Sequence, residues 1–264
     1  MRSAKRLYRT GVDYRVSALA ERLYELVCAA EAQPGRWQLR TGERDLLRGL
    51  FDLGSFCNEI SAVERILHRD GEPFPLLRIM DGNRYSRKAE FCTDVADGAG
   101  RLHSELDLVR VRRLYMQGAT LNLNQCERYH RPARHLCGRL GSLLESPVQI
   151  NAYLVCGDRP GFNPHFDSHD VIVLQGHGRK RWLLAAETTG PSIDRAQPAL
   201  DHEYLLDEGD MLFVPSGLWH SVTAVGEPSL HFTIGIHARK HGASAVLTRY
   251  RPGLSFCDLI MGNG

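Results

Sequence analysis

His165 and Asp167 are the residues whose types and spacing point most directly to chemistry. They lie two positions apart, so in an extended segment both side chains leave the same face. An imidazole, a carboxylate and a second imidazole from elsewhere in a chain form the facial triad of non-haem Fe(II) oxygenases, which leaves coordination positions open for co-substrates. The alternative is a structural hydrogen-bonded pair in a loop, because the short H-x-D pattern alone carries little information.

A third ligand has several candidates, and the surrounding sequence favours one of them. The candidates are His169, His177, His202, His220, His231 and His237. A turn at 208–210, an apolar strand and a second turn at 215–217 precede His220, and this hairpin predicts a return of that histidine toward the first pair. We expect His231 to be a hydrogen-bonded histidine, although its strand position also fits a cavity lining, and His177, between two glycines, to be exposed.

Lys180 is the candidate cation for an anionic co-substrate. Arg179, Lys180 and Arg181 are consecutive in a predicted strand, so only alternate members face inward. Lys180 shares its face with Trp182 and Leu184, which predicts an inward lysine between two outward arginines. A solvated basic turn is an equally good interpretation of this run taken alone.

The elements around these residues are of two kinds. An apolar stripe predicts a helix over 16–30 with Ser17 as its N-cap, and further helices are predicted over 44–53, 58–67 and 131–146. Residues 86–115 are mixed and partly helical. Strands are expected at 76–80, 118–124, 148–155, 170–175, 180–185, 203–206, 210–214, 219–225 and 229–237. Short strands with Gly, Pro and Asp turns favour a sandwich or barrel over an α/β sheet.

Composition narrows the class of protein. A net charge of +2 over 264 residues gives no case for binding nucleic acid or membranes through charge alone. The N-terminus lacks the apolar region of a signal peptide, and no segment approaches the roughly 18 apolar residues that span a bilayer. Seven scattered cysteines without a C-x-x-C pair predict reduced thiols and a cytoplasmic location.

The run PHFDSHDVIVLQGHGRKRW, with the later PSGLWH and SLHFTIGI, resembles the JmjC/cupin-like Fe(II)- and 2-oxoglutarate-dependent oxygenases over roughly residues 74–237. It is most similar to the branch that contains the ribosomal-protein hydroxylases. The resemblance implies a mainly β fold with helices, a double-stranded β-helix (jelly roll), with an N-terminal helical region at 1–72, the JmjC/cupin domain at 73–240 and a short tail at 241–264.

The resemblance also implies roles for individual residues. His165, Asp167 and His220 match the metal ligands, and Lys180 matches the basic residue that receives the distal carboxylate of 2-oxoglutarate. Asn151 matches an asparagine that lines the co-substrate pocket, and Thr233 on the last strand is a further candidate for that pocket. The cofactors implied are Fe(II), 2-oxoglutarate and O2.

The function implied is hydroxylation of an amino-acid side chain in a peptide or protein, either a ribosomal protein or a peptide natural-product precursor. N-demethylation uses the same site chemistry and stays open. The alternatives are a cupin metalloenzyme that does not use 2-oxoglutarate and a non-catalytic JmjC-like binding module. We expect no membrane partner, and nucleic acid only through a ribosomal substrate; a homodimer is left open. The arginine-rich segment 110–139 is expected to be a solvated helix face rather than a guide for an acidic substrate.

Overall fold

A computed structural model describes residues 2–63, 76–82, 84–158, 162–188, 197–226 and 228–237 of the chain. Within these ranges no helix is both long and apolar enough to cross a membrane. The predicted tail at 241–264 and the end of the helix predicted over 58–67 lie outside the described residues.

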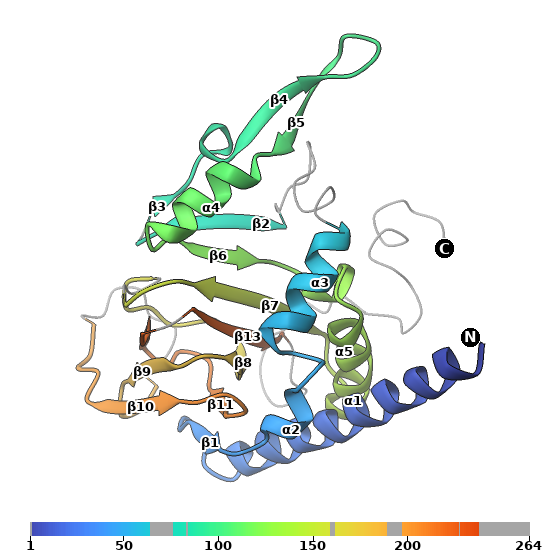
Figure 1. The fold of residues 1–264 in the computed structure, drawn as a ribbon. Coiled ribbons are helices and arrows are strands. Elements are labelled where there is room, and N and C mark those ends of the chain that lie inside the picture. Colours follow the sequence, from blue (N-terminus) through green and yellow to red (C-terminus); the bar gives the residue numbers. More distant parts are fainter. Residues whose placement is uncertain are drawn as a thin grey trace, which may run out of the picture.

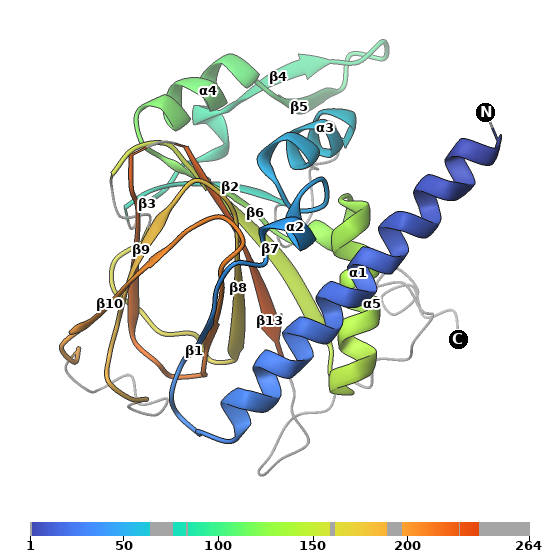
Figure 2. The ribbon, with the colours of Figure 1, turned by 60° about the horizontal axis from the view of Figure 1, so that its bottom comes forward.

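Two antiparallel sheets face each other and form the barrel (Figures 1 and 2). The larger sheet runs in the order β1 (Gln38–Arg40), β11 (Met211–Val214), β8 (Asp170–His177), β13 (Ser229–Ile236), β7 (Val148–Val155), β6 (Thr120–Leu123), β2 (Leu77–Asp81) and β3 (Arg84–Tyr85). The smaller sheet runs in the order β10 (His202–Leu206), β9 (Lys180–Leu184) and β12 (His220–Ala224).

The order of these strands along the chain is that of a double-stranded β-helix. From β8 onward the chain passes to β9 and β10 in the smaller sheet, returns to β11, crosses to β12 and ends on β13. A single antiparallel bridge between His165 and His220 adds the segment before β8 to the edge of the smaller sheet. The predicted jelly roll is therefore confirmed, and the strands predicted from residue 148 onward match the observed ones within about two residues.

The helices lie against the outer face of the larger sheet and around its end (Figure 2). They are α1 (Arg2–Glu31), α2 (Arg44–Leu47), α3 (Leu53–Val63), α4 (Leu108–Met116) and α5 (Arg131–Leu144), with single 3-10 turns η2 (Lys88–Glu90) and η3 (Cys126–Arg128). α1 crosses α5, and a hairpin of β4 (Cys92–Ala96) and β5 (Leu102–Leu106) projects beside α4 (Figure 1). This hairpin was not predicted, because most of its side chains are exposed and show no apolar alternation.

Two helix predictions were wrong in detail. Ser17 is not an N-cap, because α1 begins 15 residues earlier and the Ser17 hydroxyl donates to the Asp13 carbonyl one turn back. The single helix predicted over 44–53 is broken into α2 and α3. Gly49 has a φ of +71°, and the Asp52 carboxylate accepts hydrogen bonds from the backbone N–H of Gly49 and Ser55, which starts α3.

The larger sheet is the common wall of two apolar cores. Alternate residues of β8 and β13, such as Ile172 and Phe232, point outward and pack with α1, α3 and α5. The intervening residues point into the barrel, where Val173 packs with Trp182 and Leu184 from the smaller sheet. The helices therefore pack on the outer face of the larger sheet, and the barrel interior is filled by side chains of the two sheets.

β8 carries one extra residue where it meets β13. Leu230 pairs with His177 and His231 pairs with Gln175, so Gly176 between them is left without a partner, which is a β-bulge. A Cβ added to Gly176 would stand 2.1 Å from the carbonyl oxygen of Phe51. The loop between α2 and α3 therefore presses directly on the bulge, and only glycine fits there.

We predict that Gly176→Ala destabilises the fold by about 1–3 kcal/mol, because the methyl group must displace the Phe51 backbone. Gly138→Ala is the control: Gly138 lies in α5 with no atom within 4 Å of an added Cβ, so the change should stabilise the helix by up to about 1 kcal/mol. Urea denaturation measures both. Equal midpoints for wild type and Gly176→Ala would contradict the close contact.

His130 gives a second prediction about stability. It is fully buried among Phe51, Phe56 and Phe232, and neither ring nitrogen has a hydrogen-bond partner within the described residues. Burial lowers its pKa to about 4. Because the unfolded histidine binds a proton near pH 6.5, the unfolded state gains protons first as the pH falls, and stability should be lost between about pH 6.5 and 4.

His130→Leu should therefore raise the free energy of unfolding at pH 5 and remove part of its pH dependence in that window, by about 1.4 kcal/mol per unit of pKa shift. Denaturant unfolding at pH 7, 6, 5 and 4.5 measures this. A variant that follows the wild-type pH profile would show that the pKa of His130 is the same in the folded and unfolded states, and would contradict the prediction.

Candidate metal centre

Backbone pairing brings the two histidines together. The His165 N–H donates to the His220 carbonyl oxygen at 3.0 Å, and the His220 N–H donates back to His165 at 2.8 Å. The Gly217 N–H donates to the Asp167 carbonyl oxygen at 2.8 Å, which fixes the acidic residue against the turn that precedes β12. The three residues thus come from two segments more than 50 positions apart and meet at the edge of the smaller sheet.

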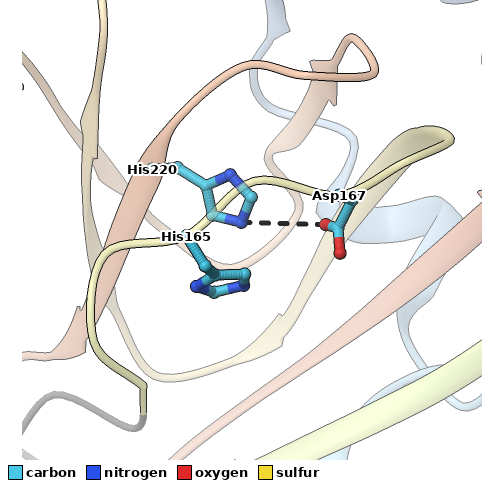
Figure 3. Close-up of side chains that lie close together, drawn as sticks. All are labelled: His165, Asp167 and His220. Carbon is cyan, nitrogen blue, oxygen red and sulfur yellow. Dashed lines mark ion pairs between the residues drawn. The ribbon is translucent and has the colours of Figure 1, made fainter. Parts of the chain in front are cut away.

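The side chains of His165, Asp167 and His220 converge (Figure 3). Their potential ligand atoms all lie within 4.8 Å of one another, and the separation of His220 Nε2 from an Asp167 oxygen is 3.8 Å. The imidazole rings of the two histidines have centroids 4.4 Å apart. Nitrogen and carboxylate ligands bind divalent metals at about 2.0–2.2 Å, so atoms at these separations are within reach of one ion.

Each imidazole is oriented by a backbone carbonyl. His165 Nδ1 lies 2.9 Å from the Asn163 carbonyl oxygen, and His220 Nδ1 lies 3.0 Å from that of Leu218. A carbonyl only accepts, so Nδ1 carries the proton and Nε2 keeps its lone pair, as in most metal-binding histidines. Burial, with the nearby His165, lowers the pKa of His220 to about 4, which keeps this ring neutral at pH 7.

The other candidate histidines have different partners. His177 forms an ion pair with Glu208 at 2.8 Å, and His202 packs on Trp37. His169 and His237 pack on each other. Among the described residues, only the predicted triad forms a group of metal-ligand type.

Lys180 is inward and buried, as the strand alternation predicted. It is 2% exposed, whereas the neighbouring Arg181 points outward and pairs with Glu203 at 2.9 Å. Burial lowers the pKa of Lys180 well below its usual value, and no acidic side chain of the described residues contributes to that pKa. Trp182, on the same face of β9, lies 5.6 Å from the His220 ring, so the lysine and the triad share the barrel interior.

Asn151 and Thr233 face each other across β7 and β13. Both form hydrogen bonds with Tyr153, whose pKa is raised to about 12 by burial and the charge of Asp167. The side-chain oxygen Oδ1 of Asn151 also accepts from the backbone N–H of Gln125, which has a φ of +53°. Asn151 therefore braces the turn at η3 as well as facing the barrel.

Tyr153 and His231 were not selected as site residues from the sequence. Tyr153 stacks on His231 at 4.9 Å and meets Phe162 edge-on at 5.9 Å, and these two residues contact Lys180 and His165 respectively. The signal was present, since Tyr153 is two residues from Asn151 in one strand and must share its face. The prediction of a hydrogen-bonded His231 is confirmed: it contacts the Lys180 ammonium.

Two arginines of segment 110–139 bind nearby backbone carbonyls. Arg110 donates to the carbonyl oxygens of Ala89 and Cys92, and Arg134 donates to those of Glu127 and Arg128. The six cysteines within the described ranges are all free thiols.

A JmjC domain model matches residues 125–243 of the chain, which confirms the predicted resemblance. Curated relatives include the bifunctional lysine-specific demethylase and histidyl-hydroxylase NO66 of Drosophila simulans, 30% identical over 147 residues that make up 51% of this chain and 17% of the relative. The corresponding protein of Drosophila melanogaster is 30% identical over 51% of this chain and 22% of its own. The chain thus spans about a fifth of the length of these relatives.

Among solved structures, Escherichia coli YcfD matches 70% of this chain and 46% of its own, with 20% identity and a TM-score of 0.46. A structure of the same protein, described as a ribosomal oxygenase in complex with cobalt and 2-oxoglutarate, matches 58% of this chain and 42% of its own, with 21% identity and a TM-score of 0.41.

We predict that the metal-free protein binds one Co(II) ion. His220→Ala removes a metal ligand and should weaken this binding more than about 100-fold, because loss of a residue that only hydrogen-bonds to a ligand already costs about 10–100-fold in affinity. His103→Ala, in the exposed β4–β5 hairpin, is the control and should bind like wild type. Isothermal titration calorimetry measures both. Equal affinities for the two variants would place the ion elsewhere.

Proposed function

We propose that the chain, which matches a JmjC domain model over residues 125–243, is an Fe(II)- and 2-oxoglutarate-dependent oxygenase that hydroxylates an amino-acid side chain in a protein or peptide. The observation that carries the proposal is a buried ammonium without an acidic partner among the described residues, in the same barrel interior as a 2-His-1-carboxylate triad. A cupin metalloenzyme that acts directly on its substrate has no need of such a lysine.

In this proposal His165, Asp167 and His220 hold Fe(II). The fit rests on their donor set, on ligand atoms within 4.8 Å of one another, and on two Nε2 lone pairs left free by the backbone contacts of Nδ1. Fe(II), 2-oxoglutarate and O2 together supply the oxidising power that places oxygen in an unactivated C–H bond. These three residues would leave further coordination positions of a bound ion for the co-substrates.

Lys180 binds the distal carboxylate of the 2-oxo acid. Placing an ammonium in a buried site is costly unless a negative charge meets it, so the anion and the lysine stabilise each other there. Asn151 and Thr233 position the Tyr153 hydroxyl on the opposite wall and close the pocket from the side of the larger sheet. Trp182 and Phe162 place apolar rings beside His220 and His165.

The names of the relatives support a class of substrate. The relatives' names include a histidyl-hydroxylase and a lysine-specific demethylase, and one structural neighbour is described as a ribosomal oxygenase. We propose a protein side chain as the target, in a ribosomal protein or a peptide precursor, in the cytoplasm and without a membrane partner. Mass spectrometry of protein fractions incubated with Fe(II), 2-oxoglutarate and O2 tests this: a gain of one oxygen atom supports hydroxylation, and loss of a methyl group indicates N-demethylation.

The co-substrate gives the decisive test. In anaerobic titration of the Fe(II)-loaded protein with 2-oxoglutarate, we expect the visible charge-transfer band of the chelate. His165→Ala should abolish the band, and Lys180→Ala should weaken 2-oxoglutarate binding by at least about tenfold, since a charge-assisted hydrogen bond is lost.

Arg181→Ala is the matched control. This variant removes a cation next to Lys180 in the sequence, but the Arg181 side chain points out of the barrel and pairs with Glu203. The titration curve of Arg181→Ala should therefore coincide with that of wild type. A folded, Fe(II)-loaded wild type that gives no band would refute the assignment of 2-oxoglutarate and favour a cupin enzyme that acts directly on its substrate.

A further inference from the structure

Two of the three N–H donors of Lys180 have fixed partners inside the protein. Nζ donates to the carbonyl oxygen of Tyr153 at 3.1 Å and to Nδ1 of His231. An ammonium has three donors and no acceptor. Within the described residues one donor therefore remains, and its direction is set by the two hydrogen bonds already made.

His231 is itself rigidly held. Its ring stacks on Tyr153 at 4.9 Å with an interplanar angle of 11°, and it meets Trp182 nearly at a right angle at 5.8 Å. It is 6% exposed. Burial and the nearby Lys180 charge lower its pKa, so the ring is neutral and Nδ1 can accept.

The β-bulge in β8 sets the direction of the His231 side chain. Pairing of β13 with β8 shifts between Leu230 and His231, opposite Gly176. The Gln175 amide fixes the shift by donating to the His177 carbonyl oxygen at 2.7 Å and to the Ser229 hydroxyl at 2.9 Å. A β-bulge changes the direction of nearby side chains relative to a regular ladder. His231 is the residue that follows the shift, and its side chain contacts Lys180.

We propose that His231 is a positioning residue for the co-substrate: by occupying one donor of Lys180, it directs the remaining N–H at the distal carboxylate of the 2-oxo acid. This inference rests on the proposed function. It implies that His231 contributes to the preference for a dicarboxylic 2-oxo acid over a monocarboxylic one. The monocarboxylic acid presents no distal carboxylate to the lysine, and its binding should not depend on His231.

The test compares two ligands on Co(II)-loaded protein by isothermal titration calorimetry, so no turnover is needed. The ligands are 2-oxoglutarate and 2-oxobutanoate, which lacks the distal carboxylate. His231→Leu should weaken 2-oxoglutarate binding about tenfold and leave 2-oxobutanoate binding within about twofold of wild type. His231→Asn, whose amide oxygen can stand where Nδ1 stands, should restore most of the lost affinity.

His130→Leu is the matched control. It makes the same chemical change at a buried histidine that packs on the outer face of the larger sheet, and it should leave both affinities unchanged. In the metal-free protein, nitrogen NMR should show the neutral His231 ring with its proton on Nε2 and a bare Nδ1, the tautomer that accepts from Lys180.

The outcomes separate the two proposals. If wild type does not bind 2-oxoglutarate, the proposed function fails. If wild type binds it and His231→Leu binds it equally well, only the role of His231 fails. The same holds if both 2-oxo acids are weakened alike, because general damage to the pocket would then explain the loss.

Discussion

The site depends on one pair of backbone hydrogen bonds, those exchanged between His165 and His220. This bridge is the only strand pairing of the segment before β8 among the described residues, and it places two imidazoles at a centroid distance of 4.4 Å. Because Asp167 lies two residues further along the same segment, its position follows from that bridge and from the Gly217 contact. The ligand set therefore forms only when the smaller sheet is complete.

The larger sheet lies between the helices and the barrel interior that contains the triad. Its outward residues pack on α1, α3 and α5, and its inward residues face the barrel interior, where Lys180 and the triad lie. The two sides meet at Gly176. There the Phe51 backbone packs against the bulge in β8. The loop between α2 and α3 therefore packs against the bulge opposite His231, the residue that contacts Lys180.

Much of this could be predicted from local sequence. The spacing of His165 and Asp167, and the alternation that turns Lys180 inward and Arg181 outward, are properties of an extended chain of any fold. The break at Gly49, the bulge at Gly176 and the contact of His231 with Lys180 could not be predicted in this way. They depend on register between strands distant in sequence, and a shift by one residue would reverse which side chains face inward.

The Lys180 ammonium has no acidic partner among the described residues, and this has a consequence for the lifetime of the chain. Without an anion beside it, the folded state carries an electrostatic cost that the unfolded chain, with its lysine in water, does not. A ligand that binds only the folded state shifts the folding equilibrium by mass action. Under the proposed function, the supply of a small metabolite would therefore govern how often the chain opens to proteases, and abundance in the cell would follow metabolic state.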